Sequence, residues 1–309
     1  MVGRPPGDRR YSWTLCAICA CGLLECALIC AARADWGRAG RAKPRAVCEQ
    51  LAAGAPPRPA TVFPGRDKRL ALATSYDLAY KALARVSVQN KRAYAMRHGL
   101  SLFVLGPASL ACDRPASWSK VLAVKAALDA GHEWAMWMDA DAVFANLSAT
   151  LDDAAHAHVS RAMRSPRTWL VLSRDAASGS RINNGVFLLR RGANADAFLA
   201  AVWNATLFLS DTPGVRNSRH GDQRAFEHAL DAMGSPSEPP TRRALTRLKR
   251  TDAPVAYVPQ REINSYPATY APGDLVVHIA GCLAGARRTR AQCAAELARW
   301  AAVDDAMVG

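Results

Sequence analysis

The stretch EWAMWMDADAVFAN, residues 133–146, decides how this chain folds. Its first half is a continuous apolar run, which is typical of a strand that is buried on both faces of a sheet. The run ends in Asp139 and Asp141, and carboxylates are costly to remove from water unless a cation or several donors satisfy them. The stretch therefore predicts a buried strand whose end meets a group that binds two acidic side chains.

The segments around this stretch alternate between strand and helix patterns. Upstream, a buried-strand pattern at 69–77 precedes helical spacing over 78–99, a second strand at 100–106 and a second helix at 117–132. This alternation predicts an α/β fold with a mostly parallel central sheet, right-handed crossovers and flanking helices. Further strand or helix patterns lie at 168–175, 184–192, 195–209, 222–233, 253–260 and 274–282.

The N-terminal part has the composition of a membrane anchor and a stem. Residues 11–32 form an apolar run with a single charge, Glu25, and the run is long enough to cross a bilayer as a helix. We interpret it as an uncleaved signal-anchor; the alternative is a cleaved signal peptide, since small residues flank Arg33. The predicted organisation is a cytoplasmic tail at 1–10, the anchor at 11–32, a Pro-, Gly- and Arg-rich stem at 33–66, and one catalytic domain at 67–303.

The positive charge is concentrated near the N-terminus. Of a formal net charge of +14, residues 1–69 supply 12 Lys and Arg against 5 Asp and Glu. The other basic cluster, 241–250, lacks the interleaved aromatic residues of a nucleic-acid reader, so we expect no nucleic-acid partner. Lys and Arg are denser after the apolar run than before it, and the positive-inside rule alone would place the C-terminal part in the cytosol. The motifs of the downstream segment favour a lumenal location, which conflicts with that rule.

The cysteines fall into two groups. Five of the nine lie inside the apolar run, and the other four are Cys48, Cys112, Cys282 and Cys293. None of these last four has CxxC spacing, which argues against a zinc site. In an oxidising lumen Cys282 and Cys293 can close a short loop, and the alternative is two buried thiols.

The acidic pair is a candidate metal site. In open α/β sheets ligands bind beyond the carboxyl ends of the strands. A spacing of two on an extended segment directs the carboxylates of Asp139 and Asp141 to the same side, an arrangement that suits Mn²⁺ or Mg²⁺. His278, near the end of the apolar strand DLVVHIAGC, is a candidate third ligand. The alternatives are an ordinary turn for the aspartates and a hydrogen-bonded core position for the histidine.

Two other stretches carry polar groups next to apolar segments. In RINNGVFLLRR, 181–191, two side-chain amides precede a buried strand, where they can contact sugar hydroxyls or simply form a turn. In HGDQRAF, Asp222 and Gln223 begin a helix, where a polar cap is expected in any case. The sequence contains no Gly-rich phosphate loop, no GxSxG elbow and no HExxH motif.

Taken together and in order, these residues resemble glycosyltransferase family 34. That family includes fungal α-galactosyl- and α-mannosyltransferases and plant xyloglucan xylosyltransferases, and the similarity is closer to the fungal branch. It extends over about 70–293. The matching stretches are 90–99, 118–120, 133–146, 182–191, 222–226, 258–267 and 273–282.

The resemblance implies a GT-A fold and an enzyme that retains anomeric configuration. It implies transfer of a hexose or pentose from a UDP- or GDP-sugar to an oligosaccharide, polysaccharide or glycoprotein acceptor. It also implies dependence on Mn²⁺, with Mg²⁺ as the alternative. The protein would be a single-pass type II membrane protein of the Golgi with a lumenal catalytic domain.

The resemblance also assigns roles to residues. Asp139, Asp141 and His278 would bind the metal, Gln223 would lie near the anomeric carbon of the donor, and Asp222 would lie beside it. The residues expected to contact the donor are Thr74, Ser75, Asn90, Lys120, Asp139, Asn183, Gly185 and Gly281.

This chain departs from the family pattern in two places. Asn184 stands where the family has threonine, and Leu283 stands where the plant enzymes have a phosphate-contacting lysine; Arg287 or Arg288 is a candidate substitute. Because an amide is a poor nucleophile, our hypothesis is a front-face transfer in which Gln223 stabilises the reacting centre and Asp222 orients it.

Two other functions compete with sugar transfer. Haloacid-dehalogenase phosphatases have an aspartate pair of the same spacing, but theirs usually follows the first strand and requires a later lysine and a downstream acidic pair. Here the pair ends the third predicted strand, and GDQRAF offers one acid followed by an amide. A non-catalytic lumenal carbohydrate-binding protein of the same fold is the second alternative, and the intact set Asp139, Asp141 and His278 argues against it.

Overall fold

The computed structural model describes residues 60–111, 113–175, 181–209, 221–234, 253–283 and 288–301 of the 309-residue chain. These residues belong to one unit, Pro56–Gly309. In this part of the chain no helix is long and apolar enough to cross a membrane. The predicted tail at 1–10 and anchor at 11–32 lie outside the described residues.

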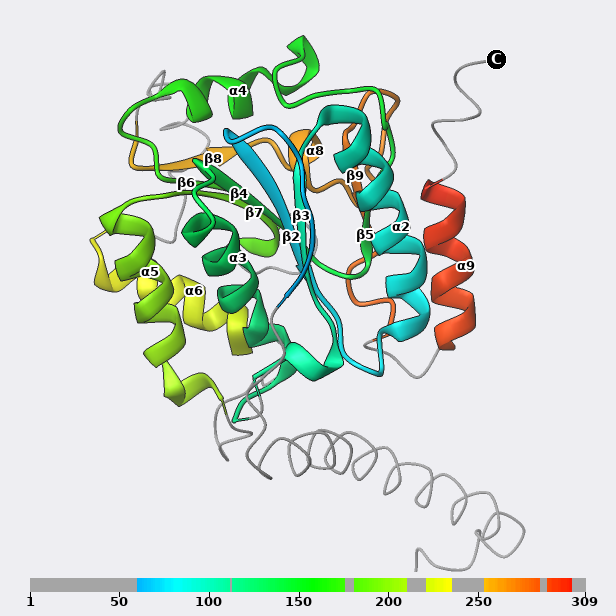
Figure 1. Cartoon of the computed structure of the whole chain (residues 1–309), viewed down its shortest axis with the longest axis horizontal. Coiled ribbons are helices and arrows are strands. Elements are labelled where there is room, and N and C mark those ends of the chain that lie inside the picture. The colour runs from blue at the N-terminus through cyan, green and yellow to red at the C-terminus, as the bar shows by residue number, and fades with distance from the viewer. Residues whose placement is uncertain are drawn as a thin grey trace, which may run out of the picture. The chain divides into compact units, whose positions relative to one another are not determined.

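A seven-stranded sheet runs through the described structure (Figure 1), with strand order β1–β3–β2–β4–β7–β6–β8. Its strands are β1 (Thr61–Phe63), β2 (Leu70–Ser75), β3 (Ser101–Leu105), β4 (Trp134–Met138), β6 (Leu170–Ser173), β7 (Asn183–Arg190) and β8 (Val255–Val258). A separate two-stranded sheet pairs β5 (Ala142–Phe144) with β9 (Val276–His278) in antiparallel orientation.

The main sheet is mixed, which corrects the prediction of a mostly parallel one. β2 is parallel to β3 and to β4, and β6 is parallel to β8. In contrast, β7 is antiparallel to both of its neighbours, and β1 is antiparallel to β3. Parallel neighbours need a crossover of about a dozen residues or more, and the connection 174–182 between β6 and β7 is shorter than that. β1 lies within 33–66, so the sheet begins before the predicted start of the domain at residue 67.

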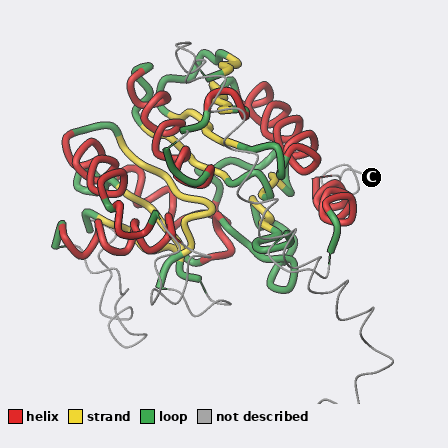
Figure 2. The backbone as a smooth tube through the Cα atoms, turned by 90° about the horizontal axis from the view of Figure 1, so that it is seen from below, coloured by secondary structure: helices red, strands yellow, loops and turns green. Residues whose placement is uncertain are grey.

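Helices cover both faces of this sheet (Figure 2). One core lies under α3 (Lys120–Asp129), α5 (Ala193–Asn204) and α6 (Gly221–Ala232), and the other under α2 (Lys81–His98) and α4 (Ala157–Arg164). Alternate residues of each strand serve the two cores: in β4, Trp137 belongs to the first and Met136 to the second. This three-layer arrangement leaves the ends of the strands for the candidate site.

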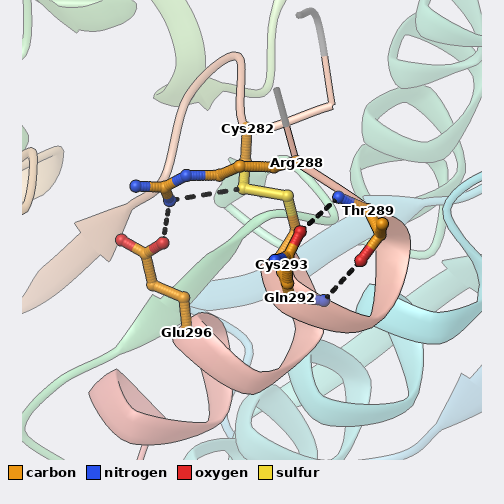
Figure 3. Close-up of a disulfide and its surroundings, with 6 residues drawn as sticks. All are labelled: Cys282, Arg288, Thr289, Gln292, Cys293 and Glu296. Carbon is orange, nitrogen blue, oxygen red and sulfur yellow. Dashed lines mark hydrogen bonds and ion pairs between the residues drawn. A yellow bond between two sulfur atoms is a disulfide. The ribbon is translucent and has the colours of Figure 1, made fainter. Parts of the chain in front are cut away.

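A disulfide attaches the C-terminal helix to the rest of the domain (Figure 3). Cys282, after β9, is bonded to Cys293 in α9 (Arg290–Ala301). The sequence left open a disulfide or two buried thiols, and the structure has the disulfide. Thr289 and Gln292 form a capping box at the start of this helix, since each side chain bonds the backbone N–H of the other. α9 lies beside α2 (Figure 1).

Candidate active site

The acidic pair lies where the chain passes from one sheet to the other. The stretch that predicted a single strand forms β4 and β5, and the residues between them make a tight turn in which the backbone N–H of Ala142 donates to the carbonyl of Asp139 (3.1 Å). Asp141 is buried, while the side chain of Asp139 keeps 30 % of its surface exposed and accepts from Trp137 Nε1 (2.8 Å). Both carboxylates are therefore held at the junction of the two sheets.

A polar stripe on α2 supports this turn from behind. Ser87, Asn90 and Lys91 occupy positions that face the core at helical spacing. The ammonium of Lys91, which is fully buried, donates to the carbonyls of Asp139 (3.0 Å) and Ala142 (2.7 Å) and to the hydroxyl of Ser87. The stripe fixes the backbone that carries the acidic pair.

His278 reaches the acidic pair from the far end of the sequence. It ends β9 and lies opposite Ala142 in the small sheet. Its Nε2 atom lies 3.1 Å from Asp141 Oδ1, and the ligand atoms of Asp139, Asp141 and His278 all lie within 4.8 Å of one another. Two carboxylates and an imidazole are a donor set suited to Mn²⁺, so the three residues that the sequence singled out can hold a divalent cation.

Gly185 makes room for the imidazole. A Cβ atom at this position would come within 2.2 Å of His278 Cε1, so any other residue would displace the ring. Asn183 lies on the same strand, where its oxygen accepts from the N–H of Gly185 (2.8 Å) and its amide donates to the hydroxyl of Tyr266 (2.5 Å). Asn183 and Gly185 therefore border the candidate metal site, and the donor contact that the resemblance assigns to them stays a prediction.

Lys120 joins the acidic pair to the start of α6. Its ammonium is buried and lies 2.8 Å from Asp222 Oδ2, 3.4 Å from Asp139 Oδ1 and 3.2 Å from the carbonyl of Asn184. The Asn184 amide in turn donates to Asp222 Oδ2 (3.0 Å). Asn184, where the family has threonine, thus orients Asp222 through its side chain.

Gln223 lies beside this network with part of its hydrogen-bonding capacity unused. It is 6 % exposed, and Oε1 accepts from the backbone N–H of Asn184 (3.3 Å). Its Nε2 atom is buried and has no hydrogen-bond partner within the described ranges. A buried amide without a partner is costly, which indicates that a ligand completes its bonding.

The charges of the site stabilise one another. Burial raises the pKa of Asp141, but His278, a backbone hydrogen bond and Lys91 together lower it below its ordinary value. Burial lowers the pKa of His278, but Asp141 and Asp139 together raise it above its ordinary value. Burial raises the pKa of Asp139, and Lys120 offsets only part of the rise. Burial raises the pKa of Asp222, but Lys120 and the hydrogen bonds from Asn184 and Ser117 together lower it below its ordinary value.

Lys91 differs from these groups because burial has the largest effect on its pKa and is not offset by its neighbours. Desolvation lowers its pKa to about 7 from the ordinary 10.5, although Asp141 and Asp139 act in the opposite direction. The ammonium is nevertheless matched by three acceptors, so its proton is held in a fully bonded position.

Two of the residues assigned to the donor by resemblance, Thr74 and Asn90, have hydrogen bonds within the protein. The hydroxyl of Thr74 donates to the carbonyl of Met138 (2.7 Å). The amide of Asn90 donates to the carbonyl of Phe144 (2.9 Å), and its oxygen accepts from the N–H of the same residue (2.7 Å). Ser75 is buried at the end of β2, and Gly281 is exposed in a left-handed turn (φ 73°) after β9.

Only one of the two candidate phosphate-binding arginines, Arg288, belongs to the described residues. Arg288 pairs with Glu296 near the disulfide (Figure 3), and Arg287 lies outside the described ranges.

Sequence reasoning missed three side chains that position the ligands: Trp137, Lys91 and Asn264. Asn264 Oδ1 lies 2.9 Å from His278 Nδ1. Lys91 and Asn264 occur in the stretches 90–99 and 258–267, which match the family, but nothing local links them to an acid or histidine far away in sequence. The sequence signal for Lys91 is its position on the core-facing side of a predicted helix. A lysine is rarely buried there unless acceptors surround its ammonium group.

The site is consistent with comparisons to known proteins. The model of the galactosyl transferase GMA12/MNN10 family matches residues 72–289. The chain is 26 % identical over 236 residues to an uncharacterized alpha-1,2-galactosyltransferase of Schizosaccharomyces pombe, and the match covers 64 % of this chain and 56 % of that protein. This chain therefore matches only a little over half the length of that relative.

One solved structure supports the fold. A glycosyltransferase involved in the glycosylation of the major capsid of the virus PBCV-1 superposes with a TM-score of 0.50 at 15 % identity, covering 74 % of this chain and 98 % of that one. At this identity the likeness concerns the fold, and it agrees with an α/β fold of the GT-A kind.

Proposed function

Because the chain belongs to the galactosyl transferase GMA12/MNN10 family, glycosyltransferase family 34, on its fungal branch, we propose that it transfers a sugar from a nucleotide-sugar donor to a glycan acceptor. The observation that carries this proposal is the meeting of Asp139, Asp141 and His278 at the junction of two sheets. A divalent cation bound there would stabilise the charge that develops on the leaving nucleoside diphosphate. We propose Mn²⁺, because the imidazole favours it over Mg²⁺.

We assign the transfer itself to the residues beside the metal ligands. Gln223 Oε1 uses one lone pair on Asn184 and keeps another for the positive charge at the anomeric carbon, while Nε2 can donate to a sugar or phosphate oxygen. Asp222 is tied to Lys120 and Asn184, which suits an orienting group better than a nucleophile. These contacts support front-face transfer with retention of configuration. Trapping a covalent sugar adduct on Asp222 would refute this mechanism.

The donor sugar is a separate part of the proposal. The Schizosaccharomyces pombe relative is named an alpha-1,2-galactosyltransferase, so we propose galactose first, with mannose and xylose as the alternatives. The test incubates the full-length chain and Mn²⁺ with UDP- and GDP-sugars and measures released nucleotide, with and without oligosaccharide acceptors. Release from one donor that Asp141→Ala abolishes would support an enzyme. Binding of sugars without release from any donor would support the non-catalytic alternative.

The cellular placement is also proposed. The apolar run 11–32 supports a type II signal-anchor, and the Cys282–Cys293 disulfide supports an oxidising compartment for the domain, as expected in the Golgi lumen. Protease protection of a C-terminal tag in intact Golgi vesicles tests the orientation. Cleavage of the tag without detergent would place the domain in the cytosol instead, as the positive-inside rule by itself predicts.

A further inference from the structure

Asn264 lies directly behind His278, just after α8 (Gln260–Ile263). Its side chain is fully buried, and Oδ1 lies 2.9 Å from His278 Nδ1. We propose that Asn264 is a positioning residue that fixes the orientation and tautomer of His278 for the metal. The inference rests on the proposed function, because it concerns the same metal site.

The bond to Asn264 determines which ring nitrogen faces the acidic pair. An amide oxygen only accepts hydrogen bonds, so Nδ1 must carry a hydrogen and donate it. Nε2 is then the ring atom left to bind a cation, and it is the atom that faces Asp141. Histidine ligands of metals usually donate their second ring N–H in this way, and the partner keeps the ring oriented.

The ring has little freedom to leave this orientation. On one side Gly185 approaches so closely that a Cβ there would overlap His278 Cε1. The backbone N–H of His278 donates to the carbonyl of Ser265 (2.8 Å), next to Asn264. His278 is therefore held by its backbone and by its Nδ1 atom, both against one short segment.

That segment is itself well anchored. The N–H of Asn264 donates to the carbonyl of Gln260 (2.7 Å), and the N–H of Ser265 donates to the carbonyl of Val276 in β9 (3.0 Å). The Asn264 amide also lies 3.4 Å from the hydroxyl of Ser173, a long bond that adds little. Asn264 and His278 therefore keep their relative positions, so the amide can act as a fixed acceptor.

A buried asparagine can also serve only to fill the core, and the test must separate that role from positioning. We compare Asn264→Leu, which keeps the volume and removes the acceptor, with Asn264→Asp, which keeps an acceptor. Ser173→Ala is the matched control, because it removes the contact on the other side of the amide. The readouts are Mn²⁺ affinity by electron paramagnetic resonance and the ¹⁵N shifts of the His278 ring in chelator, both on full-length protein.

We expect N264L to weaken Mn²⁺ binding about 10- to 100-fold and to change the His278 ring shifts, while N264D and S173A stay near wild type. Should N264L not fold, Asn264→Ala replaces it, because the smaller side chain cannot clash. Folded N264L or N264A with wild-type Mn²⁺ affinity would overturn the inference alone. A wild-type protein that binds no Mn²⁺ would overturn the proposed metal site and this inference with it.

Discussion

The metal side and the transfer side of the site are built differently. On the metal side, Asp141 pairs with His278, the second nitrogen of His278 pairs with Asn264, and Lys91 holds the turn between the aspartates. On the transfer side, Gln223 keeps a buried Nε2 atom to which the described structure offers no acceptor. The protein itself completes the bonding where an ion would bind, and it leaves hydrogen-bonding capacity where a sugar would bind.

Because of this difference, folding orients the side chains on the metal side, whereas substrate would complete the bonding on the transfer side. Folding has already oriented the candidate ligands, so a cation would meet donors that need little rearrangement. The amide of Gln223 is oriented by one bond and is completed only when substrate arrives. Substitutions on the metal side should therefore change metal affinity and stability, whereas substitutions on the transfer side should change turnover.

The largest effect is expected from Asp141→Ala. Loss of a direct ligand should exceed the loss from a supporting residue, so we expect Mn²⁺ affinity and transfer to fall by more than about 100-fold. Mn²⁺ resonance spectra and nucleotide release measure the two quantities. Wild-type release by this variant, with the protein folded, would remove the metal side from the mechanism.

Gln223→Ala should separate the two sides. We expect kcat to fall by about 100-fold, as for loss of one oriented amide at a reacting centre, with Mn²⁺ affinity unchanged. Single-turnover kinetics and Mn²⁺ titration on the same preparation provide the comparison. A parallel loss of Mn²⁺ affinity would show that the two sides act as one unit.

The third prediction concerns the pH dependence of stability on the metal side. The lowered pKa of Asp141 contributes stability above its ordinary 3.8, and this is lost as pH falls through the lowered value. The raised pKa of His278 contributes stability below its ordinary 6.5, and this is lost as pH rises through the raised value. The pair therefore contributes fully between pH 3.8 and 6.5.

Urea unfolding of wild type and His278→Gln in chelator measures this contribution. The wild-type advantage should shrink above pH 6.5 by an amount on the order of 1–3 kcal/mol, as expected for a hydrogen bond between charged groups. Mn²⁺ affinity should change in the opposite direction and rise with pH, because the ion must displace the Nε2 proton. An advantage that is constant across this range would show that the pair does not titrate as described.

The smallest effect on catalysis is expected from the disulfide. Replacing Cys282 and Cys293 by serine should lower the free energy of unfolding by about 2–3 kcal/mol, because the bond closes a short loop. Turnover should stay near wild type, since α9 contributes none of the candidate ligands. Calorimetry and nucleotide release test both parts. A loss of Mn²⁺ binding would mean that α9 supports His278.

The sequence predicted the elements of this fold better than their pairing. The apolar run before Asp139 and the helical spacing over 78–99 correspond to β4 and α2, because burial and periodicity are local properties. The antiparallel course of β7 and the split of 133–144 between two sheets depend on distant partners. The helix α4 was missed, since it is short and only half of its eight residues are apolar.

In the candidate site, too, the sequence predicted local features better than contacts between distant residues. Asp139, Asp141 and His278 could be identified because each follows or ends an apolar strand. Burial of an ionisable side chain there is costly unless a partner satisfies it. Asn90 and Lys91 are neighbours in sequence, and only the structure shows that one bonds Phe144 while the other holds the turn. Asn264 could not be linked to His278 without knowing that its segment lies along β9.

Asp141 and His278 are 137 positions apart, which has a consequence for biosynthesis. A chain that is still being synthesised could not hold the proposed ion until β9 has been made and has joined β5, so such an ion could not guide early folding steps. Such distant contacts form late and slowly. The ion would then stabilise only the completed domain, and nascent or truncated chains would be unable to consume donor.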